Sequence, residues 1–94
     1  MSNDIKNIVS NEADHMELGK FYFLNNKYDE AVSEFKKILE INPGNAEACY
    51  NIGLIKESSN QMDEAREMYS KALAVKPDYK IARVRLNKLI GIKS

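Results

Sequence analysis

The stretch YDEAVSEFKKILEINP at residues 28–43 decides the fold, because the same skeleton returns at residues 62–77 as MDEAREMYSKALAVKP. The two copies lie 34 residues apart, and each ends in a proline. The same offset places Leu18-Gly19 on Ile52-Gly53 in the segments that precede them. A fixed period of about 34 residues with two helix-length blocks per period is typical of helical repeat proteins. We therefore expect a stack of helix pairs whose function lies on its surface.

Apolar residues at helical spacing predict five antiparallel helices. Their expected ranges are 12–25, 28–41, 46–59, 62–75 and 78–90. Asn26 and Asn60 hold equivalent places and are expected to end the first helix of each pair, because asparagine tolerates the left-handed conformation. Asn45 and Asp78 are expected to cap the helices that restart after the two prolines.

Small residues recur where the two helices of a pair must approach closely. Gly19, Gly53, Ala31 and Ala65 occupy equivalent places in the two repeats. Larger side chains there would hold the helix axes apart. Their role is therefore expected to be packing.

The composition argues against several functional classes. Fourteen Lys and Arg balance fourteen Asp and Glu, so net charge gives no general attraction to nucleic acid or to an anionic membrane. No apolar run approaches the roughly 20 residues of a membrane span, and residues 1–10 lack the apolar stretch of a secretory signal. The single Cys49 fits a reducing compartment. These features predict a soluble, cytoplasmic protein.

No residue pattern predicts catalysis, a cofactor or a metal. The single histidine, His15, and Cys49 both fall at packing positions, and no Cys-His pairing or Cys-x-x-Cys spacing is present. The glycines stand singly, so there is no glycine-rich phosphate loop. We expect a protein that is not an enzyme.

The repeated residues identify a family resemblance: the chain resembles tetratricopeptide repeat (TPR) proteins. The positions that carry the resemblance are His15, Leu18, Gly19, Tyr22, Ala31, Phe35, Ile38 and Pro43, followed by Cys49, Ile52, Gly53, Lys56, Ala65, Tyr69, Ala72 and Pro77. The departures are His15 and Cys49 in place of a tryptophan or other large residue, Ile38 in place of an alanine, and Lys56 in place of a tyrosine. The resemblance implies an all-α fold, an α-solenoid with a right-handed superhelix. Repeats are then expected at 12–45 and 46–79.

The two ends of the chain are expected to differ from the repeats. Arg83 and Asn87 stand where a further repeat would need a large apolar residue and a glycine, so residues 80–94 are expected to form a capping helix that completes the protein. Residues 1–11 are expected to be a flexible tail. Alternatives for this tail are an extension of the first helix or a segment folded back on the groove.

The resemblance also implies a concave groove lined by the first helix of each pair. The residues expected to contact a partner there are Met16, Lys20, Phe23, Tyr50, Asn51, Leu54, Val84, Arg85 and Lys88. Methionine and aromatic side chains suit apolar contacts, and the basic side chains suit an acidic group. Asn51 and Arg85 also match two positions of the clamp by which some TPR adaptors hold a C-terminal carboxylate, whereas Met16, Lys20 and Ile81 do not match it.

The leading hypothesis is a non-catalytic protein–protein interaction module that binds an extended or helical peptide of a partner. An alternative is a scaffold that self-associates through the groove or the terminal helix. A second alternative is polyanion binding through the last helix, because six basic residues stand against one acid from Lys76 onward. The lack of aromatic residues after Tyr79 argues against nucleic acid.

Overall fold

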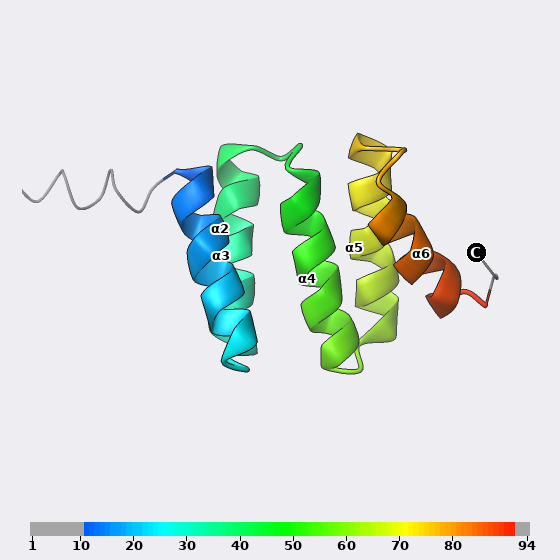
Figure 1. The fold of residues 1–94 in the computed structure, drawn as a ribbon, viewed down its shortest axis with the longest axis horizontal. Helices are drawn as coiled ribbons and strands as arrows, with labels where there is room; N and C mark the ends of the chain where they lie inside the picture. The colour runs from blue at the N-terminus through cyan, green and yellow to red at the C-terminus, as the bar shows by residue number, and fades with distance from the viewer. Residues whose placement is uncertain (1–10, 92–94) are drawn as a thin grey trace, which may run out of the picture. The chain divides into compact units, whose positions relative to one another are not determined.

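The computed structural model describes residues 11–91. This part of the chain contains helices and no strand (Figure 1). The helices are α2 (Glu12–Leu24), α3 (Tyr28–Ile41), α4 (Ala46–Ser58), α5 (Met62–Val75) and α6 (Lys80–Leu89). The chain divides into two compact units between Pro43 and Gly44. The predicted all-α fold class is confirmed.

The first unit is a hairpin of two antiparallel helices, α2 and α3 (Figure 1). A Cβ atom built on Gly19 would lie only 2.5 Å from Cε1 of Phe35. Phe35, Ala31 and Ile38 have no exposed surface. The glycine therefore lets the aromatic ring lie directly against the α2 backbone, as the packing argument predicts.

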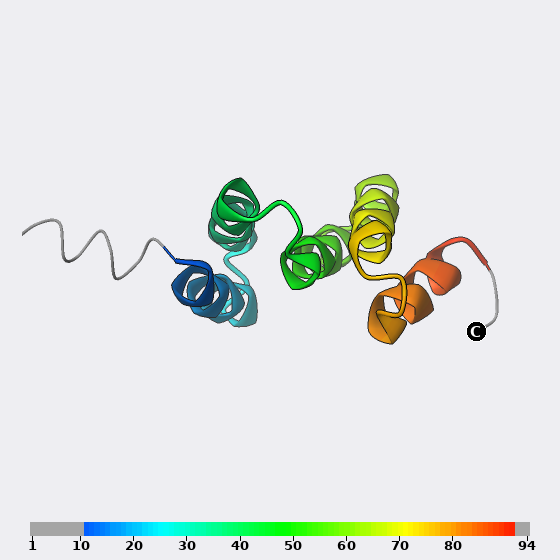
Figure 2. The ribbon, with the colours of Figure 1, turned by 90° about the horizontal axis from the view of Figure 1, so that it is seen from above.

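The second unit repeats this packing and adds a third helix. A Cβ atom on Gly53 would lie 2.5 Å from Cε1 of Tyr69, and Ala65 and Ala72 are fully buried beside it. Helix α6 packs against α5 (Figures 1 and 2). Ala82 of α6 is fully buried.

The turns inside the two hairpins follow the same design. Asn26 and Asn60 adopt left-handed backbones, with φ of 60° and 61°. The next residues close the turn, because the Lys27 amide donates to the Tyr22 carbonyl at 2.8 Å and the Gln61 amide donates to the Lys56 carbonyl at 2.8 Å. This pattern satisfies carbonyls that a helix end leaves unpaired. The prediction that both asparagines end a helix is confirmed.

Of the two caps predicted after the prolines, the first is confirmed and the second is wrong. Asn45 caps α4 as predicted, with its Oδ1 accepting from the Ala48 amide at 3.0 Å. Asp78 does not cap α6, and the helix begins at Lys80 rather than at residue 78. The reason is a turn over Pro77 and Asp78, closed by the Tyr79 amide donating to the Lys76 carbonyl at 3.0 Å.

Helix α2 is capped by Asn11, a residue that was predicted to belong to the flexible tail. Asn11 Oδ1 accepts from the Asp14 amide at 2.8 Å and so satisfies one of the free donors at the helix start. The predictions made for residues 1–10 lie outside the described residues. Within residues 11–91, no helix has both the length and the apolar character that crossing a membrane requires.

Candidate functional site

In the second unit, α4 and α6 present a half-exposed surface to which several predicted contact residues belong. We call it the α4–α6 face, and it consists of Leu54, Glu57, Ile81, Val84, Arg85 and Lys88. The four α6 residues share one side because they recur at helical spacing. Ile81 is 51% exposed and Val84 is 43% exposed, while Leu54 is half-buried. The face therefore combines accessible aliphatic side chains with charged groups.

Arg85 joins α6 to α4 by a charged contact. Its Nη1 lies 3.6 Å from Oε2 of Glu57, and the other Glu57 oxygen accepts from the Tyr69 hydroxyl at 2.7 Å. Burial alone would lower the pKa of Arg85, but a hydrogen bond with Tyr50 and the charge of Glu57 outweigh it and raise that pKa above its ordinary value. Arg85 is therefore held charged and oriented at this face.

The same network explains the state of the Tyr69 hydroxyl. Burial, followed by the hydrogen bond to Glu57 and the charge of Glu57, raises the pKa of Tyr69 well above its usual range. The phenol stays protonated and can only donate to the carboxylate. Glu57 is thus fixed from two sides, by Tyr69 on α5 and by Arg85 on α6.

Tyr50 corrects one part of the predicted contact set. It was expected to be an exposed apolar contact, but only 7% of it is exposed. Its ring centroid lies 5.7 Å from that of Tyr69 and 5.5 Å from that of Tyr79, so the two rings cover it. Asn51 is buried to the same degree. Tyr50 therefore supports Arg85 from below the surface and does not offer its ring to a partner.

A hollow of about 420 Å³ lies beside this aromatic cluster. It is lined by Gly44, Ala46, Glu47, Val75, Lys76 and Tyr79. Lys76 Nζ lies 5.0 Å from the centroid of the Tyr79 ring. Through Tyr79, which also contacts Tyr50, the hollow adjoins the residues behind the α4–α6 face. Neither the hollow nor the role of Tyr79 was predicted, because both depend on the turn that precedes α6.

The three predicted contact residues of the first unit lie on α2. Met16 is half-buried, Lys20 is exposed, and the Phe23 ring is half-buried with its centroid 5.7 Å from that of Tyr28. Leu24, at the end of the same helix, is 81% exposed. This helix therefore carries accessible apolar surface of its own.

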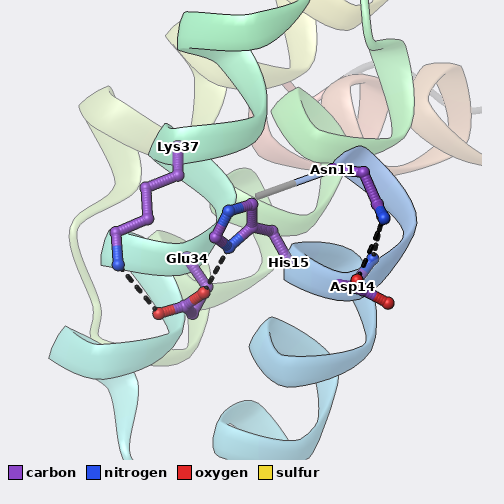
Figure 3. A network of polar contacts seen from close by, with 5 residues as sticks. All are labelled: Asn11, Asp14, His15, Glu34 and Lys37. Atoms are coloured by element: carbon purple, nitrogen blue, oxygen red, sulfur yellow. Dashed lines mark hydrogen bonds and ion pairs between the residues drawn. The ribbon is translucent and has the colours of Figure 1, made fainter. Parts of the chain in front are cut away.

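His15 lies in a polar network between α2 and α3 (Figure 3). It is buried, and its Nδ1 lies 2.7 Å from Oε1 of Glu34. The other Glu34 oxygen accepts from Lys37 Nζ at 3.3 Å. Burial alone raises the pKa of Glu34, but the hydrogen bonds to His15 and Lys37 outweigh it and hold the pKa below its ordinary value. The predicted packing role of His15 is confirmed, whereas its partner Glu34 was missed.

Cys49 occupies the equivalent packing position in the second unit and is buried, as predicted. Burial raises the pKa of its thiol, which the charge of Lys71 offsets only in part. Among residues 11–91, no group of three or more His, Cys, Asp and Glu side chains is arranged to hold a metal ion.

The sequence matches proteins with the same kind of repeat. The family model of the tetratricopeptide repeat matches residues 22–87. A peroxisomal targeting signal receptor from Candida albicans is 36% identical over 81 residues, which cover 85% of this chain and 14% of the receptor. The uncharacterized protein ycf37 from Cyanophora paradoxa is 33% identical over 87 residues, covering 88% of this chain and 51% of that protein. The chain therefore spans from a small part to about half of the length of these relatives.

Solved structures show the same fold. A crystal structure of MamA superposes with a TM-score of 0.83 at 23% identity, over 88% of this chain and 48% of that chain. A second MamA structure gives a TM-score of 0.80. At this level of identity the likeness shows the helical repeat fold alone.

Proposed function

Because the chain belongs to the tetratricopeptide repeat family, whose fold serves in general as a non-catalytic protein–protein interaction module, we propose that its α4–α6 face binds a peptide segment or helix of a partner protein. The observation that carries this proposal is the placement of Arg85 beside exposed Ile81 and Val84, with its guanidinium held by Glu57. A relative from Candida albicans is by its name a receptor for a targeting signal, which supports a peptide ligand.

The apolar part of the contact comes from Leu54, Ile81 and Val84. Aliphatic groups that are already half-exposed gain from burial under a ligand, at about 25 cal/mol for each Å² of apolar surface removed from water. The neighbouring hollow offers space for one partner side chain between Val75 and Tyr79. We propose that a partner side chain with an apolar stem and a polar end fills it, because Glu47 and Lys76 also line the hollow.

The polar part comes from Arg85 and Lys88. A guanidinium has five N–H donors, and the contact with Glu57 uses the Nη1 end. The Arg85 side chain remains 39% exposed, so it can also donate to an acidic side chain or a C-terminal carboxylate of the partner. Because Glu57 already balances part of its charge, Arg85 fixes the orientation of the ligand more than it adds affinity.

The test compares a face variant with a control in the same unit. Peptides selected from a displayed library on the wild-type chain are titrated by calorimetry against a Leu54→Ala, Val84→Ala double variant and against Met62→Ala. Met62 is a half-exposed residue on α5 and is not one of the residues of the face. Loss of two anchors is expected to weaken binding about 30-fold, and Met62→Ala is expected to change it less than about twofold. Equal affinity of the double variant and wild type, with unchanged helicity, would rule out the face.

Met16, Lys20 and Phe23 form a second proposed set of contacts on α2. They are tested separately because they belong to the first unit. Lys20→Glu is expected to weaken the binding of an acidic peptide about fivefold at low salt and less at high salt. A salt-independent effect, or none, would remove Lys20 from the proposal.

A second candidate function is self-association, favoured by the exposed Phe21 and Leu24 on α2. Sedimentation velocity over increasing concentration tests it, and Leu24→Glu is expected to return any dimer to monomer. A monomer at high micromolar concentration would remove this candidate. Polyanion binding by α6 stays a prediction that binding to heparin at increasing salt would test.

A further inference from the structure

Helix α6 has a second half-exposed side, which is separate from the α4–α6 face. We call it the terminal face, and it consists of Arg83, Leu86, Asn87 and Ile90. In the 34-residue register these residues are equivalent to His15, Leu18, Gly19 and Tyr22 of α2. Arg83 is exposed, Ile90 is 46% exposed, and Leu86 and Asn87 are half-buried. Within residues 11–91, no helix follows α6 to cover this face.

The equivalent side of α2 shows what kind of surface covers it. There His15 lies 2.7 Å from the carboxylate of Glu34, and Gly19 lies against the ring of Phe35. Both partners come from α3, which runs antiparallel to α2 (Figure 1), and Figure 3 shows the contact between His15 and Glu34. The hairpin of the first unit is therefore a template for a helix that would pack on α6.

The charge of α6 selects an acidic occupant. The helix carries four basic residues, Lys80, Arg83, Arg85 and Lys88, and no acidic residue in the segment KIARVRLNKL. Arg83 stands at the position where His15 meets Glu34 in the first unit. A carboxylate at the register of Glu34 would face the Arg83 guanidinium and form a charge-assisted hydrogen bond.

The shape of the terminal face excludes α3 and α5 of a second copy in the register that they have in their own hairpins. Asn87 takes the place of the glycine, and a Cβ at either Gly19 or Gly53 would lie 2.5 Å from the facing aromatic ring. A helix with Phe35 or Tyr69 at that register, such as α3 or α5 of another copy, therefore clashes with Asn87. The occupant must carry a small residue there.

We propose that the terminal face of α6 binds an acidic amphipathic helix of a partner protein, antiparallel to α6. Its carboxylate pairs with Arg83, its small residue lies over Asn87, and its aliphatic residues cover Leu86 and Ile90. The inference does not depend on the α4–α6 face, because Ile81, Val84 and Lys88 project from a different side of the helix.

The probe is a synthetic peptide of residues 28–41 that carries Phe35→Ala. It retains the glutamate of the Glu34 register and places a small residue opposite Asn87. A hydrocarbon staple between positions 33 and 37, both exposed on α3, maintains helicity, because free helices of this length are marginal. Binding of the labelled probe to the full chain is followed by fluorescence anisotropy.

Charge variants test the pairing with Arg83. Arg83→Glu is expected to weaken probe binding about tenfold, and the matched Lys88→Glu, the same charge change on the opposite side of α6, less than about twofold. Equal losses for the two variants would show that only the overall charge of α6 matters and would overturn the proposed register.

A shape variant tests the role of Asn87. The peptide that keeps Phe35 is expected to bind the wild type about tenfold more weakly than the probe, and Asn87→Gly is expected to recover at least half of this loss in free energy. Failure of the probe to bind would overturn the proposal. So would loss of probe binding in the Leu54→Ala, Val84→Ala double variant together with normal binding in Arg83→Glu. A wild-type dimer that Arg83→Glu dissociates would also overturn it, because the terminal face would then bind a second copy. The library-selected peptides of the α4–α6 face are expected to bind Arg83→Glu normally, so the two proposals fail separately.

Discussion

Replacing Gly53 with alanine tests the packing of the second unit through the sign of the change in stability. The added Cβ would lie 2.5 Å from Cε1 and 2.7 Å from Cδ1 of Tyr69, where carbon atoms normally keep about 3.5 Å or more. The ring has no exposed surface, and its hydroxyl donates to Glu57 at 2.7 Å. It therefore cannot move aside without disturbing both the core and the contact that orients Arg85.

The expected change in the free energy of unfolding is the sum of opposing contributions. Alanine in a helix interior is more stable than glycine by about 1 kcal/mol. Overpacking a core typically destabilises by about 1–3 kcal/mol, and loss of the Tyr69 hydrogen bond adds about 1 kcal/mol. The steric terms exceed the propensity gain, so Gly53→Ala is expected to lower the free energy of unfolding by about 1–3 kcal/mol.

The assay is urea denaturation followed by far-ultraviolet circular dichroism. Ser70→Ala on the exposed side of α5 is the control, and it is expected to raise stability by a few tenths of a kcal/mol. In a Tyr69→Leu background, Gly53→Ala is expected to become neutral or stabilising because the ring is gone. The steric explanation of this glycine is refuted if Gly53→Ala is as stable as wild type. It is also refuted if Gly53→Ala lowers the free energy of unfolding equally in the wild-type and Tyr69→Leu backgrounds.

Glu34, which contacts His15, and the thiol of Cys49 give two further predictions. Hydrogen bonds to His15 and Lys37 hold the pKa of Glu34 below its ordinary value of 4.5, so the stability that this carboxylate contributes is full above that pH and is lost as the pH falls through the lower folded value. Urea curves between about pH 6 and pH 3 are expected to show a smaller loss for Glu34→Gln than for wild type, and identical pH dependences would contradict this. Burial raises the pKa of Cys49, so iodoacetamide is expected to alkylate the native chain at least about 100-fold more slowly than the urea-unfolded chain, whereas comparable rates would show an accessible thiol.

Much of the helical framework could be predicted because it depends on local signals that recur. The ranges of α3 and α5 agree with prediction, and Asn26 and Asn60 end the preceding helices because few other residues accept a positive φ. The start of α6 was misplaced, because Asp78 lies in the turn that follows Pro77 and not at the start of the helix. Asn11 was missed as a cap because residues 1–11 were assigned to the tail as a whole.

The candidate site was less predictable than the framework. Helical spacing places Tyr50 and Leu54 on the same side of α4, yet Tyr50 is buried and Leu54 is half-exposed. The difference comes from Tyr79, whose ring covers Tyr50 from a turn that spacing along α4 does not describe. The pairing of Arg85 with Glu57 likewise joins two helices separated by a third in the chain.

The amino-acid sequence by itself determined the repeat, the helix pairs and the close packing at the glycines. Each helix is set by residues a few positions apart, and the same pattern of residues occurs in both repeats. Only the tertiary structure decided which polar groups meet and which side chains stay accessible. Glu34 contacts His15 and Glu57 contacts Arg85. Tyr50 is buried, whereas Val84 is exposed. The physical reason is that burial and ion pairing depend on the distances between side chains from different helices. A repeat pattern fixes the order of those helices but not the contacts where the repeats differ.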